Sequence, residues 1–269
     1  MDNKQTPVII YPDFEKLKTD VEKLRTELTM LFLERDDLLY QECKNIEMAY
    51  MLAVGGLEFK AYEFECAILR LKRKVELIKA KKNRQEKIDI SIIEETLNTE
   101  FAEYQAKMNE QVNKMNAALE RSHGQMLTNE ETREMKKLYR SVVKAMHPDL
   151  HPDLSEARIR LFHNAVEAYE HGDLNGLRII SEMVIKPELP DVKSDGLATL
   201  VKEKERLTKL LQSIKDRISE IKSEYPYTMK SFLQKPDQIK ARKAELEENI
   251  KQLGGVLAAY KEKVVEMMR

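Results

Sequence analysis

The sequence contains few of the residues that interrupt helices or build β-sheets. Among 269 residues there are eight glycines, eight prolines and no tryptophan, and aromatic residues make up 6% of the chain. Long helices exclude glycine and proline from their interiors, whereas β-strands are rich in aromatic and β-branched residues. Charged residues are 35% of the chain, above the roughly 25% of an average protein, as expected where long helices expose much surface to water. This composition predicts an all-α fold.

Other absences exclude several classes of function. Two cysteines, Cys43 and Cys66, are too few for a disulfide framework or a zinc site, which indicates a reducing cytoplasm. A net charge of −1 gives no general attraction to nucleic acid. No apolar run approaches the ~18 residues that cross a membrane, and "MDNKQTPVIIYPDFEK" does not read as a signal peptide. Without a phosphate-binding glycine loop or a Ser/His/Asp constellation, we expect neither an enzyme nor a cofactor.

Apolar residues recur at alternating three- and four-residue steps, which is the spacing of coiled-coil helices. The stretches cover residues 14–38, 57–78, 93–119, 197–221 and 246–267. The pattern shifts around "QECKNIE", where Asn45 is a candidate helix cap, and the polar run "KAKKNRQEK" predicts a helix end before Asp89 or Ser91 opens the next helix. Such stripes need partner helices, either in the same chain or in a second copy, so self-association through the helical arms stays open.

These patterns predict long coiled-coil-like arms flanking a separate module. The N-terminal helical region is expected over residues 1–123 and the module over 124–190, ending in the proline-bearing linker "KPELPD". The last region is expected over residues 191–269, and Ser194 or Asp195 is the candidate cap of its first helix. Its two stripes are interrupted by "YPYTMKSFLQKPD" at 225–237, which predicts an antiparallel helical hairpin.

The module contains "MHPDLHPDLS", in which His-Pro-Asp occurs at 147–149 and again at 151–153. The helix before it starts at a capping box formed by Thr128 and Glu131 and ends at Met146 or His147, because proline disfavours helical angles at the preceding residue. Asp153 or Ser155 is expected to cap the next helix. The pattern therefore predicts two antiparallel helices joined by a stiff loop, with 147–149 exposed at the tip.

Basic residues line one face of the helix that enters the loop. Lys136, Arg140 and Lys144 lie four residues apart, and Lys137 adjoins them. The opposite, apolar face is expected to bury Tyr139 against Phe162 of the second helix. A neutral chain thus carries a local basic stripe that leads into the His-Pro-Asp loop.

Anchors on both sides of the first His-Pro-Asp give the module a resemblance to the J-domain of DnaJ-type co-chaperones. Tyr139-Arg140 lie eight and seven residues before His147, and Phe162 lies seven residues before Tyr169 of an Ala-Tyr-Glu sequence, as in that family. The match covers about residues 128–172. The family's short first helix with Tyr-x-x-Leu-Gly, its glycine- and phenylalanine-rich linker, its cysteine-rich zinc module and its β-rich client-binding region have no counterpart here.

The resemblance implies docking on the ATPase domain of a DnaK-type chaperone and stimulation of that partner's ATP hydrolysis. The residues expected to bind the chaperone are His147, Pro148, Asp149, Lys136, Lys137, Arg140 and Lys144. The basic residues would steer towards an acidic surface, and Asp149 would accept a bond from a cationic group. Only the first His-Pro-Asp follows the basic helix directly, so the second is expected to stiffen the loop and cap a helix.

Alternatives to this hypothesis also follow from the residues. The chain would otherwise be a helical scaffold or adaptor that acts by coiled-coil partnering, with a degenerate J-like module. The alternating His and Asp residues of 147–153 could in principle hold a metal, although zinc prefers ligands gathered from separate elements, and we expect no metal site. The basic run "RLKRK" at 70–74 is interleaved with glutamates, which favours a solvated helix face over nucleic-acid binding.

Overall fold

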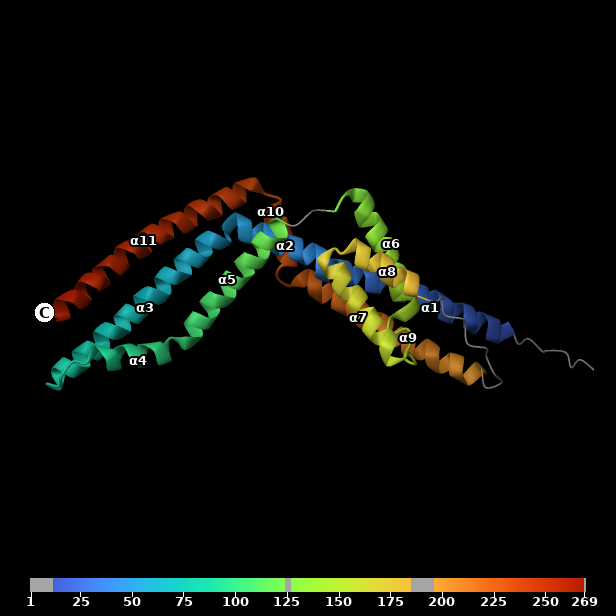
Figure 1. Cartoon of the computed structure of the whole chain (residues 1–269), viewed down its shortest axis with the longest axis horizontal. Helices are drawn as coiled ribbons and strands as arrows, with labels where there is room; N and C mark the ends of the chain where they lie inside the picture. The colour runs from blue at the N-terminus through green and yellow to red at the C-terminus, as the bar shows by residue number, and fades with distance from the viewer. Residues whose placement is uncertain (1–11, 124–126, 185–195, 269) are drawn as a thin grey trace, which may run out of the picture. The chain divides into compact units, whose positions relative to one another are not determined.

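The computed structural model describes residues 12–123, 127–184 and 196–268, and within these ranges the protein is helical and contains no strand (Figure 1). The all-α prediction is confirmed. The helices are α1 (Pro12–Asp37), α2 (Cys43–Tyr50), α3 (Gly56–Asn83), α4 (Ile90–Glu100), α5 (Ala102–His123), α6 (Asn129–Met146), α7 (Glu156–His171), α8 (Leu174–Met183), α9 (Gly196–Ser223), α10 (Lys230–Leu233) and α11 (Pro236–Met268). Two π-helical turns, η1 (Leu38–Glu42) and η2 (Met51–Gly55), and one 3₁₀ turn, η3 (Tyr227–Met229), complete the list.

The N-terminal helix does not end where the heptad pattern shifts. Residues 12–83 stay helical, with η1 and η2 inserted between α1, α2 and α3. A π-helical turn adds a residue to a helical turn, so it changes the register of the apolar stripe without breaking the helix. The prediction of a cap at Asn45 was therefore wrong. By contrast, Asp89 caps α4 as predicted, because its carboxylate accepts from the amides of Ser91 and Ile92.

The described residues divide into two compact units that differ from the predicted domains. Among the described residues, the first unit combines 12–44 with 127–184 and 196–227, and the second combines 45–123 with 228–268. α9 packs along α1, and α11 packs along α3. The predicted pairing of the two C-terminal stripes with each other, and the 191–269 hairpin, were wrong. A heptad stripe predicts that a helix needs a partner, but it does not specify which helix of similar length that partner is.

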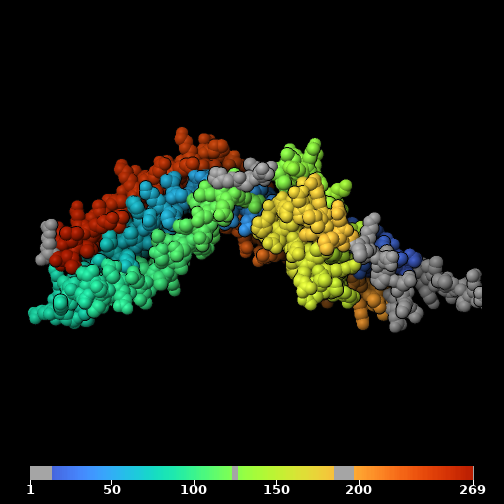
Figure 2. Space-filling view, in the orientation of Figure 1, coloured from blue at the N-terminus to red at the C-terminus, as the bar shows by residue number. Residues whose placement is uncertain are grey.

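The first unit is built on the α1–α9 pair. α6, α7 and α8 pack against one another, and α1 also contacts α6. Leu28 and Phe32 of α1, Tyr139 of α6, Tyr169 of α7 and Leu207 of α9 are fully buried in its core. In the space-filling view the atoms of α7 and α8, in yellow to orange, form one continuous mass (Figure 2).

The second unit contains α3, α4, α5 and α11. A small buried cluster of Ile78, Ile93 and Leu97 lies where α3 meets α4, and Val264 and Met267 of α11 pack against it. The helix predicted to begin at Asp89 or Ser91 and to carry the apolar stripe of residues 93–119 is divided at Phe101 into α4 and α5.

Three cations of the basic run at 70–74 form ion pairs with glutamates of α4. Arg70 and Lys74 both pair with Glu94, and Arg73 pairs with Glu100 at 2.8 Å. The sequence favoured a solvated helix face for this run, and these pairs show that part of it also links α3 to α4. The predicted linker "KPELPD" and the candidate caps Ser194 and Asp195 lie outside the described residues.

Candidate docking site

The helix that leads into the first His-Pro-Asp begins and ends as predicted. The hydroxyl of Thr128 accepts from the amide of Glu131 at 3.2 Å, and the Glu131 carboxylate accepts from the amide of Thr128 at 2.8 Å. This capping box lowers the pKa of Glu131, chiefly through the bond from the Thr128 amide. At the other end, His147 leaves the helix with ψ of 124° while its amide still bonds the carbonyl of Val143. The proline at 148 explains the termination.

His147 is buried, contrary to the prediction that the whole of 147–149 is exposed. Only 4% of its surface is accessible, because its ring stacks on Phe32 of α1 at 3.6 Å and meets the edge of Phe162 of α7 at 5.0 Å. Burial, and secondarily the nearby Arg35, lowers the pKa of His147 to about 3. The imidazole is therefore neutral at pH 7. Sequence reasoning missed Phe32, because this residue lies beside Leu31 and outside the three- and four-residue repeat of residues 14–38.

The remainder of the loop has a buried side and an exposed side. The amide of Asp149 donates to Nδ1 of His147 at 3.1 Å, and the amides of Leu150 and His151 both donate to the His147 carbonyl at 3.0 Å. Leu150 is 2% exposed, whereas the side chain of Asp149 is 52% exposed. His147 thus organises the turn from inside, and Asp149 offers its carboxylate to the solvent.

The second His-Pro-Asp has a different role from the first. Nε2 of His151 bonds the carbonyl of Lys144 at 2.8 Å, so its ring closes the last turn of α6. Asp153 is exposed, and α7 begins at Glu156 with Ser155 as its N-cap residue. The prediction that Asp153 or Ser155 caps this helix is therefore confirmed for the position of Ser155, although the Ser155 side chain makes no capping hydrogen bond. The helix end served by the second copy is the end of α6.

Three of the four basic residues predicted on α6 are exposed, and the fourth, Lys136, is partly buried. Lys136 is drawn to α1, where its ammonium pairs with Asp37 at 2.8 Å. Lys137, Arg140 and Lys144 are exposed, and Arg133, which the sequence prediction omitted, is exposed on the same face. We call Arg133, Lys137, Arg140 and Lys144 the basic stripe. Their spacing of 4, 3 and 4 residues keeps them on one side of the helix, ending next to the loop.

A pair of stacked tyrosines fastens α6 and α7 to α1. The rings of Tyr139 and Tyr169 lie 4.2 Å apart and nearly parallel. The Tyr139 hydroxyl donates to Asp36 at 2.7 Å, and the Tyr169 hydroxyl donates to Asp37 at 3.0 Å. Burial raises the pKa of Asp36, and Arg35, bonded to it at 2.7 Å, opposes that shift. The burial of Tyr139 and Phe162 predicted from the sequence is confirmed.

Other features of the described chain do not form a ligand site. No group of three or more His, Cys, Asp or Glu side chains in the described ranges is arranged to hold a metal ion. Both cysteines are buried thiols. Across residues 12–123, 127–184 and 196–268, no helix is long and apolar enough to cross a membrane.

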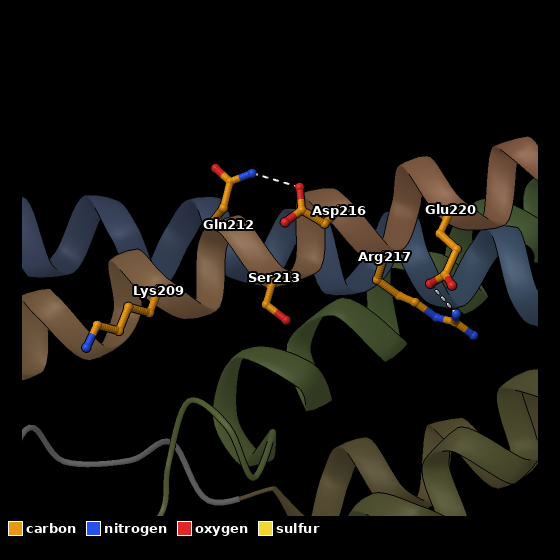
Figure 3. A pocket seen from close by; sticks show the side chains of 6 residues that line it. All are labelled: Lys209, Gln212, Ser213, Asp216, Arg217 and Glu220. Atoms are coloured by element: carbon orange, nitrogen blue, oxygen red, sulfur yellow. Dashed lines mark hydrogen bonds and ion pairs between the residues drawn. The ribbon is translucent and has the colours of Figure 1, made fainter.

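An open hollow runs along α9, and the side chains that line it come from that helix alone (Figure 3). Gln212 bonds Asp216 at 2.8 Å, and Arg217 pairs with Glu220. These polar groups are therefore already bonded to one another, which is typical of a solvated helix surface.

Comparison with known proteins identifies no relative. No protein-family model, no curated protein and no solved structure matches the chain. The function must therefore be argued from the residues of the loop and of the basic stripe.

Proposed function

We propose that the chain is a J-domain-like co-chaperone that docks on a DnaK-type chaperone through the 147–149 loop and the basic stripe. The observation that carries the proposal is the juxtaposition of two features on α6. The four exposed cations of the basic stripe lead directly to a loop that presents the carboxylate of Asp149. The hydrolysed ATP would belong to the partner, and this chain would supply no catalytic group.

The physical roles of these residues differ along the site. The basic stripe would attract an acidic surface over long range, which raises the association rate and makes it sensitive to salt. Asp149 would accept a charge-assisted hydrogen bond from a cationic group of the partner. Pro148 would limit the conformations of the free loop and so reduce the entropy lost on docking.

His147 would act from within the module. Because its ring is enclosed by Phe32 and Phe162, we assign it the positioning of the Asp149 amide and not direct contact with the chaperone. Lys136, which pairs with Asp37, would likewise stabilise the module more than it steers the partner.

The test is the steady-state ATPase activity of a purified DnaK-type chaperone, with and without the full chain. We expect stimulation by the unaltered chain and its loss in Asp149→Asn. Asp153→Asn is the matched control, since it makes the same change in the second His-Pro-Asp at an exposed aspartate, and it should retain stimulation. The proposal would be contradicted if the unaltered chain stimulated none of several such chaperones at neutral pH and physiological salt.

A structural adaptor is the second candidate, and one observation favours it. The ring of His147 is covered by α1, a helix that lies outside the J-like sequence match. In this case the J-like module would serve as a rigid brace on the α1–α9 pair, and the helical arms would bind a client or a second copy. The adaptor and co-chaperone hypotheses differ in what Asp149→Asn should do. An adaptor would keep its self-association, measured by light scattering, and its client binding, measured by pull-down, when that carboxylate is neutralised.

A further inference from the structure

The backbone of Asp149 is held from two directions. Its amide donates to His147 within the loop at 3.1 Å, and its carbonyl accepts from Nη1 of Arg206 at 2.6 Å. Arg206 lies on α9, 57 residues further along the chain. The side chain of Asp149 is left half exposed. A helix outside the J-like module therefore fixes the residue whose carboxylate faces the solvent.

The guanidinium of Arg206 is itself fixed. Its Nε and Nη2 donate to the two carboxylate oxygens of Glu203 at 2.8 and 2.9 Å, and Glu203 also accepts from Arg25 of α1 at 3.0 Å. The bond from Arg206 is the chief cause of the lowered pKa of Glu203. A planar guanidinium held at two nitrogens has its third nitrogen aimed in one direction. Arg25, Glu203 and Arg206 thus form a relay from the α1–α9 pair to the loop.

We propose that Arg206 is a positioning residue for the docking loop and that the α1–α9 pair, through Glu203, sets the loop's conformation. The consequence for docking rests on the function proposed above, whereas the effect on the loop does not. A loop whose carbonyl is anchored loses less entropy when the Asp149 carboxylate engages a partner. Without the anchor, the loop would sample more conformations and the carboxylate would be correctly placed for a smaller fraction of the time.

The direct test is backbone amide hydrogen exchange of the full chain, measured at Leu150 and His151. Both amides donate to the His147 carbonyl and not to Arg206, so their exchange reports the loop. His151 is the cleaner reporter, because the Leu150 amide belongs to the same peptide group as the Asp149 carbonyl that accepts from Arg206. Arg206→Ala should accelerate their exchange by at least about tenfold, because a hydrogen bond from a charged donor is lost. Arg217→Ala is the matched control, since it removes an arginine of the same helix that also pairs with a glutamate three residues away but does not contact the loop.

A second variant separates positioning from damage to the fold. Glu203→Gln keeps Arg206 and the side-chain volume but weakens the fork that orients it, so it should also accelerate exchange at Leu150 and His151, by less than Arg206→Ala. Combining the two changes should add little to Arg206→Ala alone, because both act through one relay. Amides of α3, in the other unit, should exchange as in the unaltered chain.

The functional measurement is the dependence of chaperone ATPase activity on the concentration of the chain. Arg206→Ala should raise the half-maximal concentration about tenfold and keep the maximal stimulation, because the docking groups are present but less often correctly placed. The inference would be overturned if amide exchange at Leu150 and His151 were unchanged in Arg206→Ala. It would also be overturned if Arg217→Ala accelerated this exchange as much as Arg206→Ala does. If the unaltered chain stimulates no chaperone, the proposed function fails, and the exchange measurements still decide whether Arg206 positions the loop.

Discussion

The two units use the same heptad spacing and bury different kinds of side chain. In the first unit α1 is covered by α9 and also by α6, and its interior contains the fully buried rings of Phe32, Tyr139 and Tyr169. In the second unit Val54, Ile78 and Leu97 are also fully buried, but no aromatic ring among its described residues is. Within the described length of α11, Leu246 is the one residue that is buried, and α5 keeps Leu119 at 40% exposure.

The difference shows what periodicity does and does not specify. A stripe predicts that a helix will pair, whereas burial depends on how many neighbours cover it. In a pair of helices, the side chains at the edges of the contact remain exposed to water. A further layer of helices buries these side chains as well. α6 supplies this layer to α1, so substitutions in the first unit should be costly and equivalent ones in the second unit should be mild.

The largest expected effect is that of Phe162→Ala. Phe162 is 5% exposed and contacts His147, so its removal creates a cavity that should lower the free energy of unfolding by about 3–5 kcal/mol. Urea unfolding followed by circular dichroism measures this loss. Leu119→Ala in α5 is the comparison, with an expected loss of only about 1 kcal/mol because 40% of the residue's surface is already in water. Similar losses at the two sites would refute the contrast between the units.

The next largest expected effect is the contribution of His147 to the pH dependence of the free energy of unfolding. The pKa of His147 is lowered from 6.5 to about 3 by burial, so the unfolded chain binds a proton between these values that the folded chain does not. Stability should therefore rise with pH through this window and fall on acidification, by at most about 2 kcal/mol between pH 6.5 and 5. Asp36, whose pKa burial raises, acts in the opposite direction because its folded form holds the proton more tightly.

His147→Gln isolates the histidine from these other groups. The glutamine does not titrate, so the melting temperature of the variant should depend less on pH below 6.5 than that of the unaltered chain. At pH 7 the variant should also be less stable by about 1–3 kcal/mol, because an amide replaces a stacked ring in a buried site. A change of His147 that left melting unaffected would show the ring to be outside the core.

The basic stripe should affect docking and not folding. Changing Lys137, Arg140 and Lys144 together to alanine should weaken binding to a DnaK-type chaperone at least about tenfold at low salt and flatten its salt dependence. Unfolding should change by less than about 0.5 kcal/mol per site, since these side chains are exposed. Lys136→Ala is the matched control on the same helix: its ammonium pairs with Asp37, so binding should change little.

How far the sequence predicted the structure depends on the range of the interaction. The capping box at Thr128, the helix end at His147 and the burial of Tyr139 and Phe162 were predictable, because each follows from residues close in sequence. The pairing of α9 with α1 was not, since stripes of equal spacing are interchangeable as partners.

The candidate site shows the same division. Exposure of Lys137, Arg140 and Lys144 followed from the helical spacing. The burial of His147 did not, because it depends on Phe32, a residue that the chain brings to the loop only when α1 packs on α6. Arg206 was missed for the same reason, as its bond to Asp149 spans two elements far apart in the sequence.

The smallest expected effect concerns the paired glycines of α11 in the second unit. Glycine in a helix interior is less favourable than alanine by up to about 1 kcal/mol. A Cβ at Gly255 would meet nothing within 4 Å, and one at Gly254 would lie in ordinary contact, 3.6 Å from the ring of Phe64. Each change to alanine should therefore stabilise the second unit by about 0.5–1 kcal/mol in thermal or urea unfolding. If Gly255→Ala instead lowers the free energy of unfolding, the space beside Gly255 is not empty. Another surface must then pack against this side of α11 in solution.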